Sequence, residues 1–155
     1  MRVINNLMVC CLRQGDWKQL HQLQKLGRRY HVQNPVVRGE LLATEGEAEF
    51  QQGNRHRARR LIVQAKNYLG DAPTASWFTI RFLELRLDEP SQAEFHRRAT
   101  ELESKLKDVA EPRVVTVEIA IARVALQCGH IEIGQNVLSR LERTVSGEPA
   151  KRGNP

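Results

Sequence analysis

The densest positive charge in the chain lies between residues 55 and 60, and guanidinium groups are its main chemical resource. Such groups bind phosphates and carboxylates through two parallel hydrogen bonds. Together with two arginines near the end of the helical segment at residues 17–31, the arginines of this stretch form a possible anion- or nucleic-acid-binding surface. Its residues are Arg28, Arg29, Arg55, Arg57, Arg59 and Arg60. The alternative is a solvated face, on which arginine stems cover apolar neighbours and pair with nearby glutamates.

Residues that could catalyse a reaction are present but scattered. The carboxylates between residues 40 and 49 divide between two faces of a helix, with Glu45 and Glu49 on one and Glu40 and Glu47 on the other. This division favours a solvated face or a partner contact over general acid–base catalysis. The five histidines have no paired spacing, and GxxxxGK, GxSxG and HExxH motifs are absent. We therefore expect a non-enzymatic protein with no cofactor and no metal.

Length and composition indicate one globular domain. The 155 residues are 41% hydrophobic and 27% charged, with a formal net charge of +6. That charge permits association with nucleic acid, acidic proteins or anionic surfaces. Cys10, Cys11 and Cys128 are odd in number and form no CxxC motif, so we expect buried, reduced thiols. The apolar start of the chain is interrupted by Asn5 and Asn6, and no segment approaches the ~18 apolar residues of a membrane span. The expected location is cytoplasmic.

A repeat organises the chain and positions these side chains. Prolines at 35, 73, 112 and 149 are spaced by 38, 39 and 37 residues, and three of them follow a glycine by 20 residues. The apolar residues between these points recur every three or four positions, as in amphipathic helices. We predict four units, each an antiparallel pair of helices, at about residues 1–35, 36–73, 74–112 and 113–149.

The expected helices follow from the turns and stops of each unit. They cover residues 3–13, 17–31, 36–52, 55–69, 74–87, 90–111, 114–128 and 131–145, with a flexible tail at 148–155. Thr74 is a plausible amino-terminal cap, and Pro90 fits a first helical turn. Segment 114–128 alternates like a strand, which leaves that alternative open, but its length and alanines favour a buried helix.

Small residues after each turn resemble the tetratricopeptide repeat over about residues 2–149. Ala58 follows Gly53 by five residues, and Gly134 follows Gly129 by the same interval. Trp77 also matches the aromatic position near the start of a first helix. The units exceed the usual length of about 34 residues, so the resemblance is to a divergent member. It implies an all-α, right-handed solenoid of about four hairpins, or eight helices, forming a single domain over residues 1–147.

The resemblance also implies a concave wall lined by the first helix of each hairpin. Such walls bind peptides or partner helices. The expected partner-binding residues are Asn5, Val9, Arg13, Glu40, Glu47, Phe50, Phe78, Phe82, Arg86 and Arg123. The arginines between 55 and 60 belong to a second helix, and therefore to the opposite, convex side.

The amino-terminal helix is apolar on more than one face, which is unusual for the end of a solenoid. We expect another surface to cover it, from a homodimer partner, a second protein or further repeats. The leading hypothesis is thus a protein-interaction scaffold or adaptor. The alternatives are an RNA- or ribosome-associated module that uses the basic surface, and a small chaperone for a secreted client.

Overall fold

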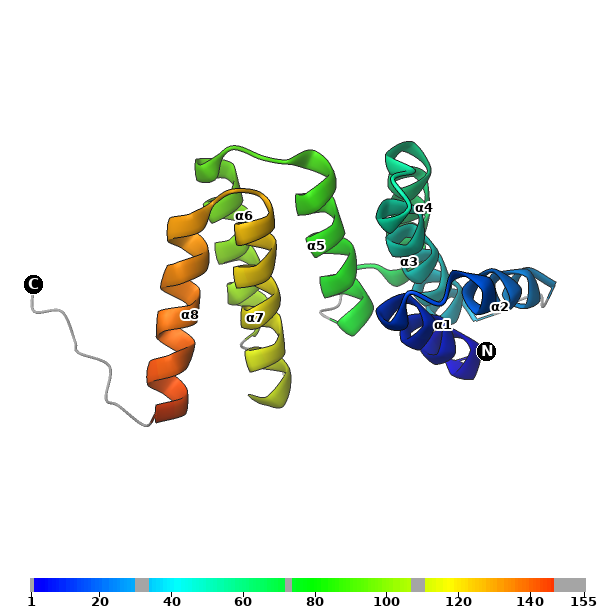
Figure 1. Cartoon of the computed structure of the whole chain (residues 1–155), viewed down its shortest axis with the longest axis horizontal. Helices are drawn as coiled ribbons and strands as arrows, with labels where there is room; N and C mark the ends of the chain where they lie inside the picture. The colour runs from blue at the N-terminus through cyan, green and yellow to red at the C-terminus, as the bar shows by residue number, and fades with distance from the viewer. Residues whose placement is uncertain (1, 30–33, 72–73, 107–110, 147–155) are drawn as a thin grey trace, which may run out of the picture. The chain divides into compact units, whose positions relative to one another are not determined.

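The computed structural model describes residues 2–29, 34–71, 74–106 and 111–146, and their regular structure is entirely α-helical (Figure 1). The helices are α1 (Arg2–Gln14), α2 (Trp17–Arg29), α3 (Pro35–Gln51), α4 (Arg55–Leu69), α5 (Ala75–Asp88), α6 (Gln92–Lys105), α7 (Glu111–Gln127) and α8 (Ile131–Ser146). The all-α class is confirmed, and the alternating segment lies in α7 except for Cys128, which follows the helix. The tail predicted at 148–155 lies outside the described residues. None of the described helices is long and apolar enough to cross a membrane.

The chain forms two compact units, Met1–Leu87 and Asp88–Pro155, and each is considered by itself. In the first unit, α1 packs against α2 and α3 against α4 as antiparallel pairs joined by short turns (Figure 1). In the second unit, α7 and α8 form a third such pair. The boundary between the units falls at the end of α5, so α5 and α6 belong to different units.

The turn glycines predicted from the sequence adopt the left-handed backbone conformation that closes each pair. Their φ values are 69° at Gly15, 82° at Gly53 and 80° at Gly129. A side chain at such a position is strained, whereas glycine is not. At the turn where the sequence has no glycine, Glu89 takes a φ of 47°. The same chain reversal is therefore made there by a residue that pays a conformational penalty.

Polar caps define where helices begin, and two of the sequence predictions need correction there. Asn34 caps α3 by accepting hydrogen bonds from the next turn, and Thr74 Oγ1 accepts one from Trp77 N at 3.2 Å. Ser91 caps α6, so Pro90 precedes that helix instead of lying in its first turn. Pro112 does not end a helix, because it lies in the first turn of α7, where its missing N–H costs nothing.

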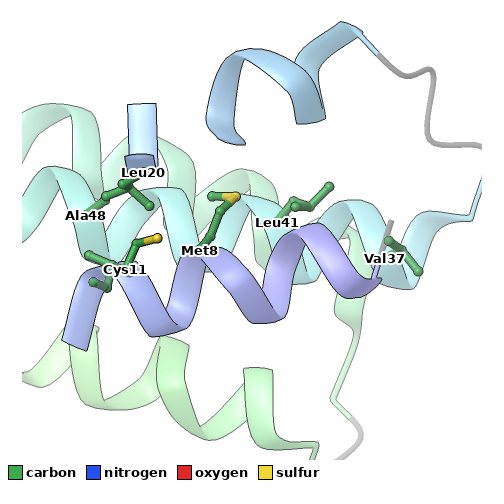
Figure 2. Close-up of a cluster of buried hydrophobic side chains, with 7 residues drawn as sticks. Met8, Cys11, Leu20, Val37, Leu41 and Ala48 are labelled. Carbon is green, nitrogen blue, oxygen red and sulfur yellow. The ribbon is translucent and has the colours of Figure 1, made fainter. Parts of the chain in front are cut away.

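Helix α3 connects two hydrophobic clusters formed by described residues of the first unit. Figure 2 shows the first cluster, in which Met8 of α1, Leu20 of α2 and Leu41 of α3 meet. The second cluster joins the other face of α3 to α4 and α5 through Ala43, Ala58, Ile62, Ala65, Ile80, Leu83 and Leu87. Because α3 is covered on most sides, even Glu45 and Glu49 are buried.

The close approach of α3 to α4 depends on glycine. A β-carbon placed on Gly39 would lie 2.6 Å from Leu69 Cγ and 3.1 Å from Tyr68 Cβ, both on α4. A β-carbon on Gly46 would meet Ile62 at 3.4 Å, an ordinary contact. Gly39 is therefore the position at which the two helices interlock.

The second unit is built around buried residues of α6, α7 and α8. Phe95 of α6 is fully buried, and its ring lies 4.9 Å from the imidazole of His130. His130 is also within 3.0 Å of the Pro90 carbonyl oxygen through Nε2. Arg140 of α8 bridges to Glu103 and Glu118 at 2.6 and 3.3 Å. These contacts connect all three helices of the unit.

Candidate functional site

Three first helices of the first unit, α1, α3 and α5, are joined by polar side chains, among them Asn5, Glu47 and Arg86 of the predicted concave wall. Thr44 of α3 donates a hydrogen bond of 2.8 Å to Asn5 of α1. Arg86 of α5 pairs with Glu47 of α3 at 2.7 Å, and its guanidinium lies 4.3 Å from the centre of the Phe50 ring. Among the residues predicted for the wall, we call the accessible ones on α1, α3 and α5 the first-helix face: Asn5, Val9, Arg13, Glu40, Glu47, Phe50, Phe82 and Arg86.

The remaining two residues predicted for the wall behave differently. Phe78 is only 4% exposed and packs between Trp77 and Phe82 along α5. Phe82 is half-buried, so it is the phenylalanine of this pair whose ring a partner can reach. Arg123 is exposed on α7, in the second unit.

Two arginines of the basic stretch are bound to the end of another helix. Arg55 and Arg59 donate hydrogen bonds to the carbonyl oxygen of Leu87, at 2.8 and 3.1 Å. A helix carries partial positive charge at its beginning and partial negative charge at its end. The repulsion these arginines meet at the start of α4 is therefore offset by attraction to the end of α5, which explains their position without a ligand.

Two further arginines neutralise buried glutamates on α3. Glu45 is 8% exposed and accepts from Arg28 at 3.0 Å, while Glu49 is 7% exposed and pairs with Arg57 at 3.1 Å. The hydrogen bonds to Glu45 raise the pKa of Arg28 above its ordinary value. The expectation of a solvated acidic face is thus wrong for Glu45 and Glu49. A carboxylate can be buried when an ion pair with a guanidinium compensates its charge.

A pocket of about 470 Å³ lies within the first unit, among α1, α2, α3 and α4. Its lining consists of Met8, Gly27, Arg28, Arg29, Arg38, Leu41, Leu42, Glu45, Arg57 and Leu61. The structure therefore brings together three of the six predicted anion-binding arginines, Arg28, Arg29 and Arg57. The fourth guanidinium, that of Arg38, could not be found from the sequence, because Arg38 stands alone near the start of α3 with no basic neighbour in the chain.

Helix α1 keeps an apolar surface beside its buried face. Val3 is 69% exposed and Leu7 is 48% exposed, whereas Met8, Cys11 and Leu12 are buried in the first cluster. Within the described residues, no helix of the unit covers Val3 or Leu7. The polar residues expected on the outer face of a terminal helix are therefore absent where Val3 and Leu7 lie.

The cysteines are free thiols in different surroundings. Cys10 is exposed, while Cys11 is buried and donates to Gln19 Oε1 at 3.4 Å. Burial raises the pKa of the Cys11 thiol. Within the part of the chain that the structure describes, no three histidine, cysteine or carboxylate side chains come together as metal ligands.

Comparisons of the chain with protein-family models, with characterised proteins and with solved structures give no match.

Proposed function

We propose that the chain is a non-enzymatic protein-interaction module that binds a peptide or helix of a partner protein on the first-helix face. The observation that supports this most directly is the arrangement of Phe50 and Arg86. Arginine and aromatic side chains are enriched at protein interfaces and among the residues that dominate binding energy. The Arg86 guanidinium is already held over Phe50 and against Glu47, so a partner would order few side chains on binding.

The face also offers both apolar and charged contacts. Val9, Phe50 and Phe82 are half-buried, so each presents part of an apolar side chain, while Arg13 is exposed. The face carries Glu40 and Glu47 as well as Arg13 and Arg86, so a peptide that combines hydrophobic residues with charges of both signs would match it. We further propose that the exposed side of α1, with Val3 and Leu7, extends the interface or pairs with a second copy of the chain.

The finer fold assignment is part of the same proposal. We propose that the two units continue one right-handed, tetratricopeptide-like solenoid in a cytoplasmic protein. Its support is the small residue five positions after the turn: Ala58 is fully buried after Gly53, and Gly134 is buried after Gly129. Small-angle scattering from the full chain tests this point, since a solenoid gives a more elongated profile than two packed bundles.

The RNA-binding alternative receives less support from the same residues. Arg28 and Arg57 pair with glutamates, and Arg55 and Arg59 bind the end of α5. Phosphates would compete with these internal partners. A gel shift with RNA at low salt that weakens steeply toward physiological salt would nevertheless favour this alternative over the first-helix face.

Site-specific photocrosslinking in the native cell tests the proposed face. A photoreactive amino acid replaces Phe82, and in a separate variant it replaces Val63, which is 56% exposed on α4 and outside the face. We expect a discrete adduct from position 82, weaker after Arg86→Ala, and none from position 63. Equal adducts at both positions would contradict the proposal, and so would an adduct at position 82 that Arg86→Ala leaves unchanged.

A further inference from the structure

We propose that the pocket among α1, α2, α3 and α4 binds a small organic anion that carries an apolar group. Aliphatic and aromatic carboxylates and phosphate monoesters belong to this class. The pocket is separate from the first-helix face, so this proposal does not depend on the partner protein. Three properties of the lining carry it: the balance of charge, the contact of Arg38 with Tyr68 and the apolar side chains.

The lining has an excess of positive charge. It contributes four guanidiniums, from Arg28, Arg29, Arg38 and Arg57, and one carboxylate, from Glu45, which leaves a net charge of +3 (four minus one). Glu45 would repel an anion, but both its oxygens accept hydrogen bonds from Arg28, at 3.4 and 3.0 Å. Outside the lining, Glu49 similarly pairs with Arg57.

Arg29 and Arg38 are the guanidiniums of the lining that have no carboxylate partner among the described residues. The Arg38 guanidinium lies 5.0 Å from the centre of the Tyr68 ring on α4. Stacking on a ring uses the face of the guanidinium and leaves its N–H edge available for a carboxylate or phosphate. Tyr68 therefore helps to position the exposed Arg38 side chain, whose N–H groups have no carboxylate partner among the described residues.

The apolar part of the lining favours an organic ligand over a bare inorganic ion. It consists of Met8, Leu41, Leu42 and Leu61, and Met8 and Leu41 are themselves buried. A volume of about 470 Å³ is within the usual range for sites that take small molecules. An anionic head can bind the arginines while hydrocarbon covers the leucines. Single-stranded nucleic acid fits less well, because its bases stack on aromatic side chains and the described residues of the lining include none.

Calorimetric titration of the full chain tests the proposal with matched probes. Octanoate and octyl phosphate carry both parts of the ligand, octan-1-ol lacks the charge, and acetate and inorganic phosphate lack the apolar group. We expect octanoate or octyl phosphate to bind at one site. Every other probe should bind with at least about tenfold lower affinity, because it lacks either the charged contact or the buried hydrocarbon chain. Whichever of octanoate and octyl phosphate binds with the higher affinity identifies the preferred head group.

Two variants locate the binding site. Arg38→Gln removes a guanidinium that has no carboxylate partner among the described residues, and it should weaken the better probe about tenfold. Arg60→Gln removes an exposed arginine on α4 that does not line the pocket and should leave affinity unchanged. A Leu42→Gln variant, checked for an unchanged helical circular-dichroism spectrum, should also weaken binding.

Three results would overturn the assignment. One is that neither octanoate nor octyl phosphate binds at concentrations up to about 10 mM. A dissociation constant above this value would mean an affinity lower than a single well-placed contact should give. The second is equal loss of affinity in Arg38→Gln and Arg60→Gln, which would indicate general attraction to positive charge. The third is binding of single-stranded RNA that depends on Arg38, in a protein that binds neither octanoate nor octyl phosphate. This result would assign the pocket to the phosphates of nucleic acid.

Discussion

Arg55, in the first turn of α4, donates a hydrogen bond of 2.8 Å to the carbonyl oxygen of Leu87, in the last turn of α5. The contact joins the beginning of one helix to the end of another across 32 residues of sequence. It accounts for a basic side chain in a place where the dipole of its own helix disfavours it. The most basic stretch of the chain is thus partly a structural element of the first unit.

Replacing Arg55 or Arg59 with alanine should destabilise the first unit by about 1 kcal/mol each, because the carbonyl oxygen of Leu87 loses a charged donor. Urea unfolding followed by circular dichroism measures the change. Arg60→Ala is the matched control, since this neighbouring arginine is exposed, and it should change stability by less than about 0.5 kcal/mol. Equal effects at all three positions would indicate a general effect of charge.

Gly39→Ala should destabilise the first unit by about 1–3 kcal/mol, because the added methyl group would overlap Leu69 and push α4 away from α3. Gly46 lies about two helical turns after Gly39 on α3. The methyl group of Gly46→Ala would make only an ordinary contact with Ile62. The substitution should be neutral or stabilising by up to about 1 kcal/mol, since alanine favours the helix. The pair is compared by urea midpoint, and the reverse order of the two variants would refute the interlock at Gly39.

The Arg86–Glu47 pair should show a coupling free energy of about 1 kcal/mol, at the upper end of the range for ion pairs near the surface. Its side chains are 17% and 18% exposed, so solvent screens the pair only partly. A double-mutant cycle with Arg86→Met and Glu47→Gln isolates this term from the stacking of Arg86 on Phe50. Additive single effects would show that the pair contributes nothing beyond packing.

Glu94 should confer a pH dependence on the second unit. Hydrogen bonds from Arg97 and then Arg98 lower the pKa of its carboxyl from 4.5 to about 2. A carboxyl with a lowered pKa in the folded state stabilises that state above 4.5 and loses this contribution as the pH falls toward 2. Wild type and Glu94→Gln should therefore differ most near neutral pH and converge between pH 4.5 and 2 in unfolding experiments.

A carbon-detected titration of the Glu94 side chain provides the direct check. The side chain lies at the surface, so added salt should raise its pKa toward the ordinary value. An apparent pKa near 4.5 at low salt would contradict the hydrogen-bonded geometry.

Much of the helical framework could be predicted from local signals. The turn glycines at 15, 53 and 129 mark positions that need a positive φ, and the apolar residues between them recur with the helical period. Proline was harder to interpret. It is tolerated just after a helix and in the first turn of the next, so Pro112 could be assigned to either side of a boundary from the sequence alone.

The partners of charged side chains could not be predicted, because they depend on which helices meet. Arg28 reaches Glu45 across 17 residues, and Arg59 reaches Leu87 across 28. Sequence spacing along one helix contains no information on such contacts. The pocket shows the same limit, because Arg38 joins Arg29 and Arg57 only when α2, α3 and α4 pack together.

The short turns between α1 and α2, between α3 and α4, and between α7 and α8 also have a kinetic consequence. Within each pair, contacting residues are close in sequence, so little loop entropy opposes their first encounter. Each pair can therefore gain helical structure and tertiary contacts in the same early step. Low contact order of this kind favours fast folding, and the Leu87 contacts of Arg55 and Arg59, which span about 30 residues, belong to a later step.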